Sequence, residues 1–171
     1  GASTTDWIQT AIPKDAFGGG FMSRLLFVVQ ESTPRVFPIP PPLDERMKKD
    51  LQSELLFISK LKGDYVLTSE GRDWYENWYR TRNVGAGASR QYAGYFERKP
   101  DHIMRMAMIL AAARLEEDLL LTKSDLSRAN KILTWVEAFL PSTFDEFATS
   151  DQDDQARRLV RLLKNNGGAL Q

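Results

Sequence analysis

The stretch PDHIMRMAMILAAA, residues 100–113, decides the fold class of this 171-residue chain. Its apolar residues recur at intervals of three and four, which is the period of a helix that buries one face. Further apolar residues extend this surface almost all round, as expected of a central helix. Pro100 lies at the predicted start of the helix, where a missing N–H costs nothing, and Met106 is expected to be buried. The apolar positions are Ile103, Met104, Met106, Ala107, Met108, Ile109, Leu110 and Ala111.

Two helices and a short strand are predicted before this segment. The first helix spans residues 44–62 with Asp44 near its start, and a turn leads from it to a strand over residues 65–67. A second helix follows, with Thr68 or Ser69 as its N-cap. The first helix has one apolar face, made of Met47, Leu51, Leu55 and Ile58.

A short strand and a capped helix are predicted after the central segment. The strand covers residues 119–121, and Thr122 with Asp125 forms a capping box for the next helix. Shorter helices are expected over residues 6–12 and 156–163. The fold class is therefore mainly α (α+β), with five or six helices and a few short strands. The helix after Thr122 is expected to bury Leu126, Ala129, Leu133, Val136 and Leu140.

Three regions are expected along the chain. Residues 1–43 form a strand-containing segment that ends in a stiff Pro-rich connector, for which a partner-docking motif is the alternative. Residues 44–150 form a helical domain. Residues 151–171 contain a C-terminal helix or the start of a truncated winged-helix unit. We expect the chain to be a fragment of a longer protein.

Composition excludes several classes of chemistry. Lysine and arginine total 23, as do aspartate and glutamate, so the formal net charge is zero. This balance argues against a nucleic-acid surface over the whole domain but leaves room for a local basic patch. The chain has no cysteine and a single histidine, His102, which excludes disulfides, thiolate metal sites and a His-pair zinc site. No metal site is expected. No apolar run approaches the roughly 20 residues of a membrane span, and no signal peptide is visible, so a cytoplasmic location without membrane contact is expected.

A glycine-rich loop delivers one arginine to an apolar run. Gly18, Gly19 and Gly20 precede Arg24, and residues 25–29 are predicted to form a buried strand. Arginine offers a fork of donors that suits phosphate. Arg24 is therefore either a phosphate contact on a nucleotide held elsewhere or a structural ion pair.

Two further groups of side chains are candidates for binding. Four aromatic residues between positions 74 and 79 share a helix, and they either pack in a core, stack on single-stranded bases or contact a neighbouring domain. Arg80, Arg82 and Arg90 belong to a basic, glycine-containing linker that either tracks phosphates or is a solvated connection. The aromatic residues are Trp74, Tyr75, Trp78 and Tyr79.

A basic cluster is predicted at the beginning of the central helix. Arg98, His102 and Arg105 lie on one line there, where they bind phosphate or pair with acidic residues. No phosphate-binding loop of the G-x-x-x-x-G-K-[ST] type occurs in the chain. The sequence also shows no compact group of catalytic residues, so the hypothesis of an enzyme that acts by itself is the least favoured of the three.

A resemblance to a known protein family rests on three segments: residues 19–24, Leu67-Thr68-Ser69-Glu70 and residues 102–110. Over residues 3–140 the chain resembles the C-terminal part of phage and plasmid primase–helicase proteins with a RecA-like ATPase core, many of them grouped only as a family of unknown function. The sequence departs from a complete ATPase, because the phosphate-binding loop and the acidic metal-holding strand are absent. ATP and Mg²⁺ are therefore implied for a longer parent, and no cofactor is expected in this chain.

The resemblance implies roles for matching residues. Thr4 and Thr5 would lie near the nucleotide, and Arg24 would be an arginine finger that reaches a γ-phosphate in a neighbouring subunit. The implied partners are the missing ATPase core, which residues 1–43 would complete or abut, DNA and further copies of the chain. The implied function in DNA replication is an accessory region that organises DNA or subunit contacts for a helicase. A stand-alone helical protein-interaction module is the alternative.

Overall fold

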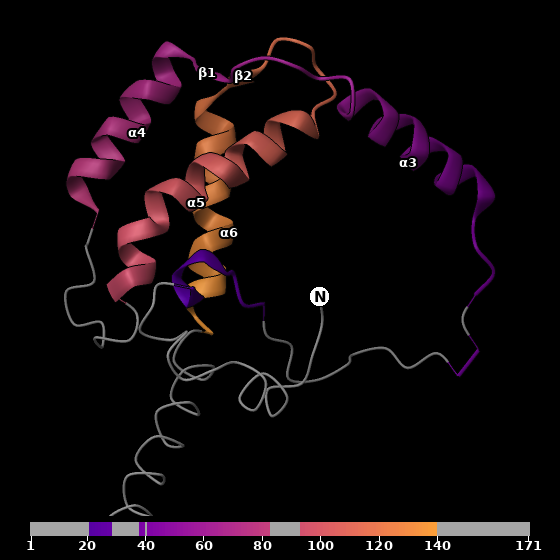
Figure 1. The fold of residues 1–171 in the computed structure, drawn as a ribbon, viewed down its shortest axis with the longest axis horizontal. Coiled ribbons are helices and arrows are strands. Elements are labelled where there is room, and N and C mark those ends of the chain that lie inside the picture. Colours follow the sequence, from indigo (N-terminus) through magenta and orange to yellow (C-terminus); the bar gives the residue numbers. More distant parts are fainter. Residues whose placement is uncertain (1–20, 29–37, 40, 83–92, 140–171) are drawn as a thin grey trace, which may run out of the picture. The chain divides into compact units, whose positions relative to one another are not determined.

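The computed structural model describes residues 21–28, 38–39, 41–82 and 93–139. These residues are mainly helical, as predicted, and contain four α-helices, one 3₁₀ turn and a two-stranded sheet (Figure 1). Two compact units divide the chain: residues 1–29 with 136–171, and residues 30–135. The elements are η1 (Met22–Arg24), α3 (Glu45–Ile58), β1 (Val66–Leu67), α4 (Ser69–Thr81), α5 (Ala93–Ala112), β2 (Leu120–Leu121) and α6 (Lys123–Glu137).

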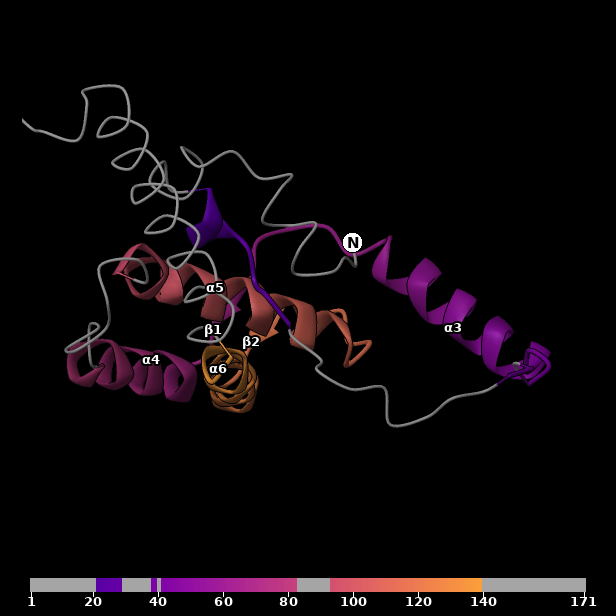
Figure 2. The ribbon, with the colours of Figure 1, turned by 90° about the horizontal axis from the view of Figure 1, so that it is seen from below.

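The two short strands pair in parallel. Val66 lies opposite Leu120 and Leu67 opposite Leu121. The Val66 N–H donates to the Leu119 carbonyl at 3.0 Å, and the Thr68 N–H donates to the Leu121 carbonyl at 3.1 Å. Each strand leads directly into a helix, so the parallel pairing brings the N-terminal ends of α4 and α6 side by side (Figures 1 and 2).

The N-caps of α3 and α4 match the sequence prediction. Asp44 accepts hydrogen bonds from the N–H groups of Arg46 and Met47 at 2.9 and 3.1 Å. Thr68, rather than Ser69, caps α4, and its hydroxyl accepts from the Gly71 N–H at 3.1 Å. A side-chain oxygen at each position therefore satisfies N–H groups that have no partner within the helix.

The core centres on α5 and α6. The predicted apolar row of α6 is buried, with Leu126, Ala129 and Leu133 fully covered and Val136 only 2% exposed, whereas Leu140 lies outside the described residues. From α5, the side chains of Ile103, Ala107 and Ala111 are buried.

The prediction that Met106 is buried is wrong, and the nearly continuous apolar surface of α5 is covered on one side only. Met106 is only half-buried, and Met108 and Ile109 are 39% and 63% exposed. A helix buries its whole circumference only when neighbours cover every side, and here the small residues Ala107 and Ala111 mark the covered face.

The predicted start of α5 at Pro100 is also wrong. The helix begins at Ala93, and Pro100 lies in its interior. An interior proline removes one backbone hydrogen bond and costs about 3 kcal/mol. Packing offsets this cost, since Tyr95 is buried, stacks on His102 at 5.7 Å between ring centroids and meets Phe96 edge-on at 5.4 Å.

The expected strand after Arg24 does not form over the residues that can be checked. Residues 25–28 are irregular, and Leu25 and Val28 are 36% and 66% exposed. A strand needs a hydrogen-bonded neighbour, and the sheet among the described residues consists of β1 and β2 alone. The helices predicted over residues 6–12 and 156–163 lie outside the described residues. Among the helices that the structure describes, none is long and apolar enough to cross a membrane.

Candidate functional site

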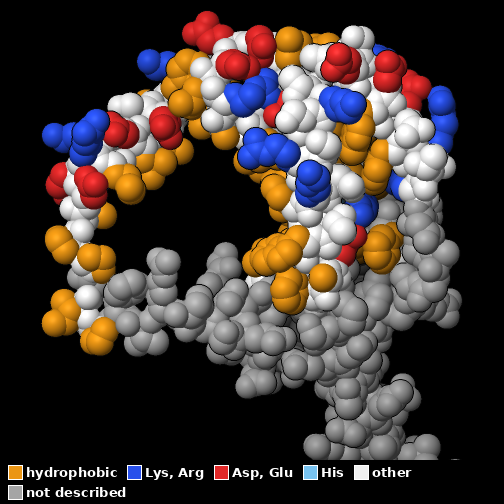
Figure 3. Space-filling model, turned by 180° about the vertical axis from the view of Figure 1, so that it is seen from behind, with side chains coloured by type: hydrophobic (Ala, Val, Ile, Leu, Met, Phe, Trp, Pro, Cys, Tyr) orange, Lys and Arg blue, Asp and Glu red, His pale blue; other side chains and the backbone are white. Residues whose placement is uncertain are grey.

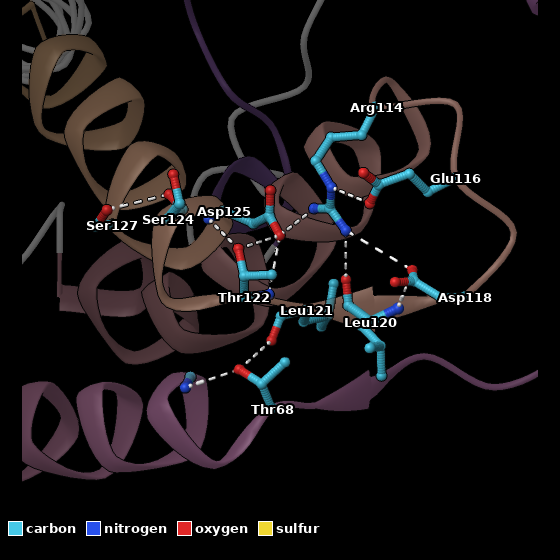
Figure 4. Close-up of polar contacts among 11 residues, drawn as sticks. Thr68, Arg114, Glu116, Asp118, Leu120, Leu121, Thr122, Ser124, Asp125 and Ser127 are labelled. Carbon is cyan, nitrogen blue, oxygen red and sulfur yellow. Dashed lines mark hydrogen bonds and ion pairs between the residues drawn. The ribbon is translucent and has the colours of Figure 1, made fainter.

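Arg114 is the centre of a polar network that joins four segments (Figure 4). Its guanidinium donates to the carboxylate of Asp125 at the start of α6 and, through Nη2, to the Leu120 carbonyl in β2 at 3.0 Å. In the loop after α5, its Nε donates to Glu116 at 2.9 Å, and Nη2 lies 3.9 Å from Asp118. The fork geometry of one arginine thus connects the end of α5, the following loop, β2 and α6.

The Thr122–Asp125 capping box is confirmed and belongs to the same network. The Asp125 Oδ2 atom accepts from the Thr122 N–H at 2.9 Å and from the Thr122 hydroxyl at 2.8 Å. In return, the Asp125 N–H donates to the Thr122 hydroxyl at 3.3 Å. The Asp125 side chain is 2% exposed and that of Arg114 is 24% exposed, so the pair is largely removed from water.

The charges of this pair are fixed by their surroundings. Burial by itself raises the pKa of Asp125, but hydrogen bonds from Thr122 and Arg114 outweigh it and hold the pKa below its usual range. Hydrogen bonds to Glu116 and Asp125 raise the pKa of Arg114 further. Each polar atom of the pair named here bonds within the network, which makes this a structural clamp rather than a reactive centre.

No sequence pattern indicates a role for Arg114. The capping box is a local pattern of residues three apart, whereas the arginine lies eleven positions before its acidic partner in an irregular loop. Leu115 and Leu119, which flank this loop, have positive φ angles of 59° and 49°. Such angles are rare for leucine, and the Arg114 hydrogen bonds to Glu116 and Leu120 span the same stretch.

The aromatic residues of α4 form two adjacent pairs along the helix, one stacked and one tilted. Trp74 and Trp78 are stacked with their ring centroids 6.3 Å apart, and Tyr75 and Tyr79 lie 6.1 Å apart. The first three are half-buried, and Tyr79 is 48% exposed. Burial is the main cause that raises the pKa of the Tyr75 phenol, and the nearby Tyr79 raises it further, while Arg82 opposes the shift. This aromatic surface is therefore shared between the interior and the solvent.

The predicted nucleic-acid-binding arginines of α4 are engaged with the helix itself. Arg80 forms an exposed ion pair with Glu76 at 3.0 Å. The Arg82 guanidinium lies 4.0 Å from the Tyr79 ring centroid and 5.8 Å from that of Trp78. Its Nη1 atom is buried and makes no hydrogen bond within the described part of the chain. Arg90, the third member, lies outside the described residues.

The predicted cluster at the beginning of α5 is divided between core and surface. His102 is 7% exposed and stacks on Tyr95, so its imidazole belongs to the core. Arg98 is half-buried and Arg105 is exposed. The structure therefore does not gather the three side chains on one solvent-facing surface.

The residues predicted to lie near a nucleotide are only partly visible. Arg24 is the last residue of η1 and is exposed, and its N–H donates to the Phe21 carbonyl at 3.0 Å. Thr4 and Thr5 lie outside the described residues. In the parts of the chain that the structure describes, no group of three or more His, Cys, Asp or Glu side chains is placed to hold a metal ion.

Helix α3 carries a row of exposed apolar side chains. None of its residues is buried, although its sequence is strongly amphipathic. Figure 3, seen from behind, shows hydrophobic side chains gathered along this helix at the left. The predicted apolar face exists, but it faces solvent instead of a core. Of its members, Met47 is 68% exposed, Leu51 54% and Leu55 56%, while Ile58 is half-buried.

Comparisons with known proteins add no assignment: no family model matches the chain, and neither a curated protein nor a solved structure is similar to it.

Proposed function

We propose that this chain is an accessory region of a phage- or plasmid-type DNA primase–helicase that organises subunit or DNA contacts for an ATPase core outside the chain. The proposal combines the sequence resemblance with the exposed apolar face of α3. ATP and Mg²⁺ would be bound by that core, and Arg24 would approach the nucleotide from this region.

The exposed face of α3 is the observation that carries the proposal. Leu51 and Leu55 follow one another at a spacing of four and are each more than half exposed. Contiguous exposed apolar side chains on one helix mark a contact surface, whereas single ones do not. Acidic and basic residues flank this row, which favours a protein partner over a polyanion.

A test of the proposal begins with the reading frame upstream of residue 1. A phosphate-binding loop in the same frame would identify the parent, and that protein would then be purified with and without Leu51→Asp combined with Leu55→Asp. Mass photometry is expected to show loss of the assembled parent in the variant. A matched control is Arg46→Asp with Lys49→Asp on the same helix, which is expected to leave assembly intact.

A stand-alone helical interaction module is the second candidate, and the same face of α3 supports it. The two functions differ in what lies upstream. A reading frame that lacks an ATPase would contradict the helicase proposal and favour the second candidate, which capture of α3 by a separate protein would then test.

A further inference from the structure

The charged residues that helix α6 exposes fully to solvent are all basic. They are Lys123, Arg128 and Lys131, whereas of its two acidic residues Asp125 is buried and Glu137, at the C-terminal end, is half-buried. In Figure 3 the view from behind brings α6 in front of α5, and blue side chains follow it. The remaining exposed positions are hydroxyl-bearing or apolar: Ser124, Ile132, Thr134 and Trp135.

This charge pattern distinguishes α6 from the other described α-helices. Each of those mixes both signs at its exposed positions, and several of these charges pair within the helix. By contrast, Lys123, Arg128 and Lys131 form no ion pair with any residue in the described ranges. The exposed acidic residues of the other helices are Glu45, Asp50 and Glu54 in α3, Glu70, Asp73 and Glu76 in α4, and Glu97 and Asp101 in α5.

An aromatic side chain continues the basic row. Arg128, Lys131 and Trp135 follow one another at spacings of three and four, so they lie on one line of the helix surface. The row extends over about 10 Å at 1.5 Å per residue. Trp135 is 51% exposed and presents a large ring surface at one end of this row.

We infer that the outer face of α6 is a binding site for single-stranded DNA. Lysine and arginine side chains would contact consecutive phosphates, and the Trp135 ring would stack on an unpaired base. Every base has a π-face, so stacking of this kind is tolerant of sequence. The zero net charge of the chain means that attraction to a polyanion has to come from a local surface such as this one.

The inference deepens the proposed function, since it rests on the DNA-related role and names where DNA is bound. It replaces the α4 arginines as the DNA contacts, because Arg80 pairs with Glu76 and Arg82 lies on aromatic rings. The buried face of α6 anchors the site rigidly through Leu126 and Leu133. Phosphate-contacting side chains therefore project from a fixed helix.

The test measures fluorescence anisotropy of a labelled 15-nucleotide oligothymidylate with the full 171-residue chain between 50 and 200 mM salt. Three phosphate contacts to a single strand give a slope of about −2 in a plot of log affinity against log salt. Arg128→Glu with Lys131→Glu is expected to weaken binding at least tenfold and to flatten this slope.

A matched control separates the site from net charge. Lys48→Glu with Lys49→Glu on α3 changes the charge of the chain by the same amount at exposed positions, and it is expected to change the affinity by less than twofold. An equal loss of binding in both variants would overturn the assignment to α6. Far-ultraviolet circular dichroism and thermal melting establish that each variant is folded.

Trp135 supplies an independent readout. Binding of the oligothymidylate is expected to quench tryptophan fluorescence, and Trp135→Phe is expected to remove most of that quenching. Binding of a 15-base-pair duplex as tight as that of the single strand, or unchanged quenching in the variant, would overturn the stacking role. Absence of binding by the wild-type chain would overturn the site as a whole, yet leave the α3 assembly test of the proposed function unaffected.

Discussion

Removing the Arg114 side chain tests the clamp that holds α5, β2 and α6 together. In Arg114→Ala the Asp125 carboxylate, 2% exposed, keeps its bonds from Thr122 but loses its positive partner. Breaking a buried pair from one side costs about 3 to 5 kcal/mol. Because the Arg114 side chain is itself 24% exposed, we expect the lower end, about 3 kcal/mol.

The assay is urea unfolding of the full chain at pH 7, followed by circular dichroism at 222 nm. A double-mutant cycle with Asp125→Asn separates the pair from the other contacts of Arg114. We expect a coupling free energy of about 1 to 3 kcal/mol. Arg80→Ala serves as the control, since its ion pair with Glu76 is exposed and is worth below about 0.5 kcal/mol.

The pH dependence has a definite sign. The pKa of Asp125 lies lower in the folded chain than the value of about 3.9 in the unfolded chain. Its contribution to the free energy of unfolding is therefore fully present above about pH 4 and is lost as the pH falls through the folded pKa. The difference between wild type and Arg114→Ala should shrink over the same interval. A loss below about 0.5 kcal/mol at pH 7, with no coupling to Asp125→Asn, would refute the clamp.

Four further predictions follow from the fold and the proposed function. Gly71→Ala is expected to lower the free energy of unfolding in urea by about 1 to 2 kcal/mol, because overpacking outweighs the better helix propensity of alanine. The new Cβ would lie 2.7 Å from the Leu121 carbonyl oxygen. A more stable variant would contradict this close approach. Leu51→Asp should change that free energy by less than about 0.5 kcal/mol, since the side chain is exposed, and a large loss would place α3 in a core. The chain alone should release no phosphate from ATP, and turnover that a point substitution within the chain abolishes would be inconsistent with an external ATPase core. In the proposed parent, Arg24→Ala should lower DNA-stimulated ATP turnover tenfold or more, equivalent to about 1.4 kcal/mol, while the melting temperature moves little; early melting with normal turnover at low temperature would assign the residue a structural role.

Local patterns predicted the local structure well. The caps at Asp44, Thr68 and Thr122 and the apolar row of α6 were all visible, because caps and helical periodicity involve residues three or four apart. Periodicity also gave the apolar face of α3, but not its exposure. Burial depends on which neighbour lies opposite, and the pattern of one helix does not contain that information.

At two positions of α5 the structure differs from the prediction made from the local sequence pattern, and each difference has a physical reason. The sequence predicts a helix start at Pro100 because proline fits the first turn, yet the helix begins at Ala93, where Tyr95 makes buried aromatic contacts. His102 looked like a member of a basic cluster because Arg98 and Arg105 share its helical line. Its position beside Tyr95 makes it part of the core, and only the tertiary contact distinguishes the two readings.

The starts of α4 and α6 show how far a local signal extends. Thr68 and Thr122 each follow a short strand, and each hydroxyl accepts from the N–H three residues later, at 3.1 Å from Gly71 and 3.3 Å from Asp125. The residue three positions after each threonine is Gly71 in α4 and Asp125 in α6, and the two have different surroundings. At position 71 the Leu121 carbonyl leaves no space for a Cβ, whereas the Asp125 side chain reaches Arg114.

The parallel pairing of β1 with β2 brings both of these environments about. It joins Val66 to Leu120 across more than fifty intervening residues, and no residue of either strand specifies its partner. The sequence can therefore predict two capped helices. The need for glycine at one cap and the binding of the carboxylate by arginine at the other follow only from the pairing of the two strands.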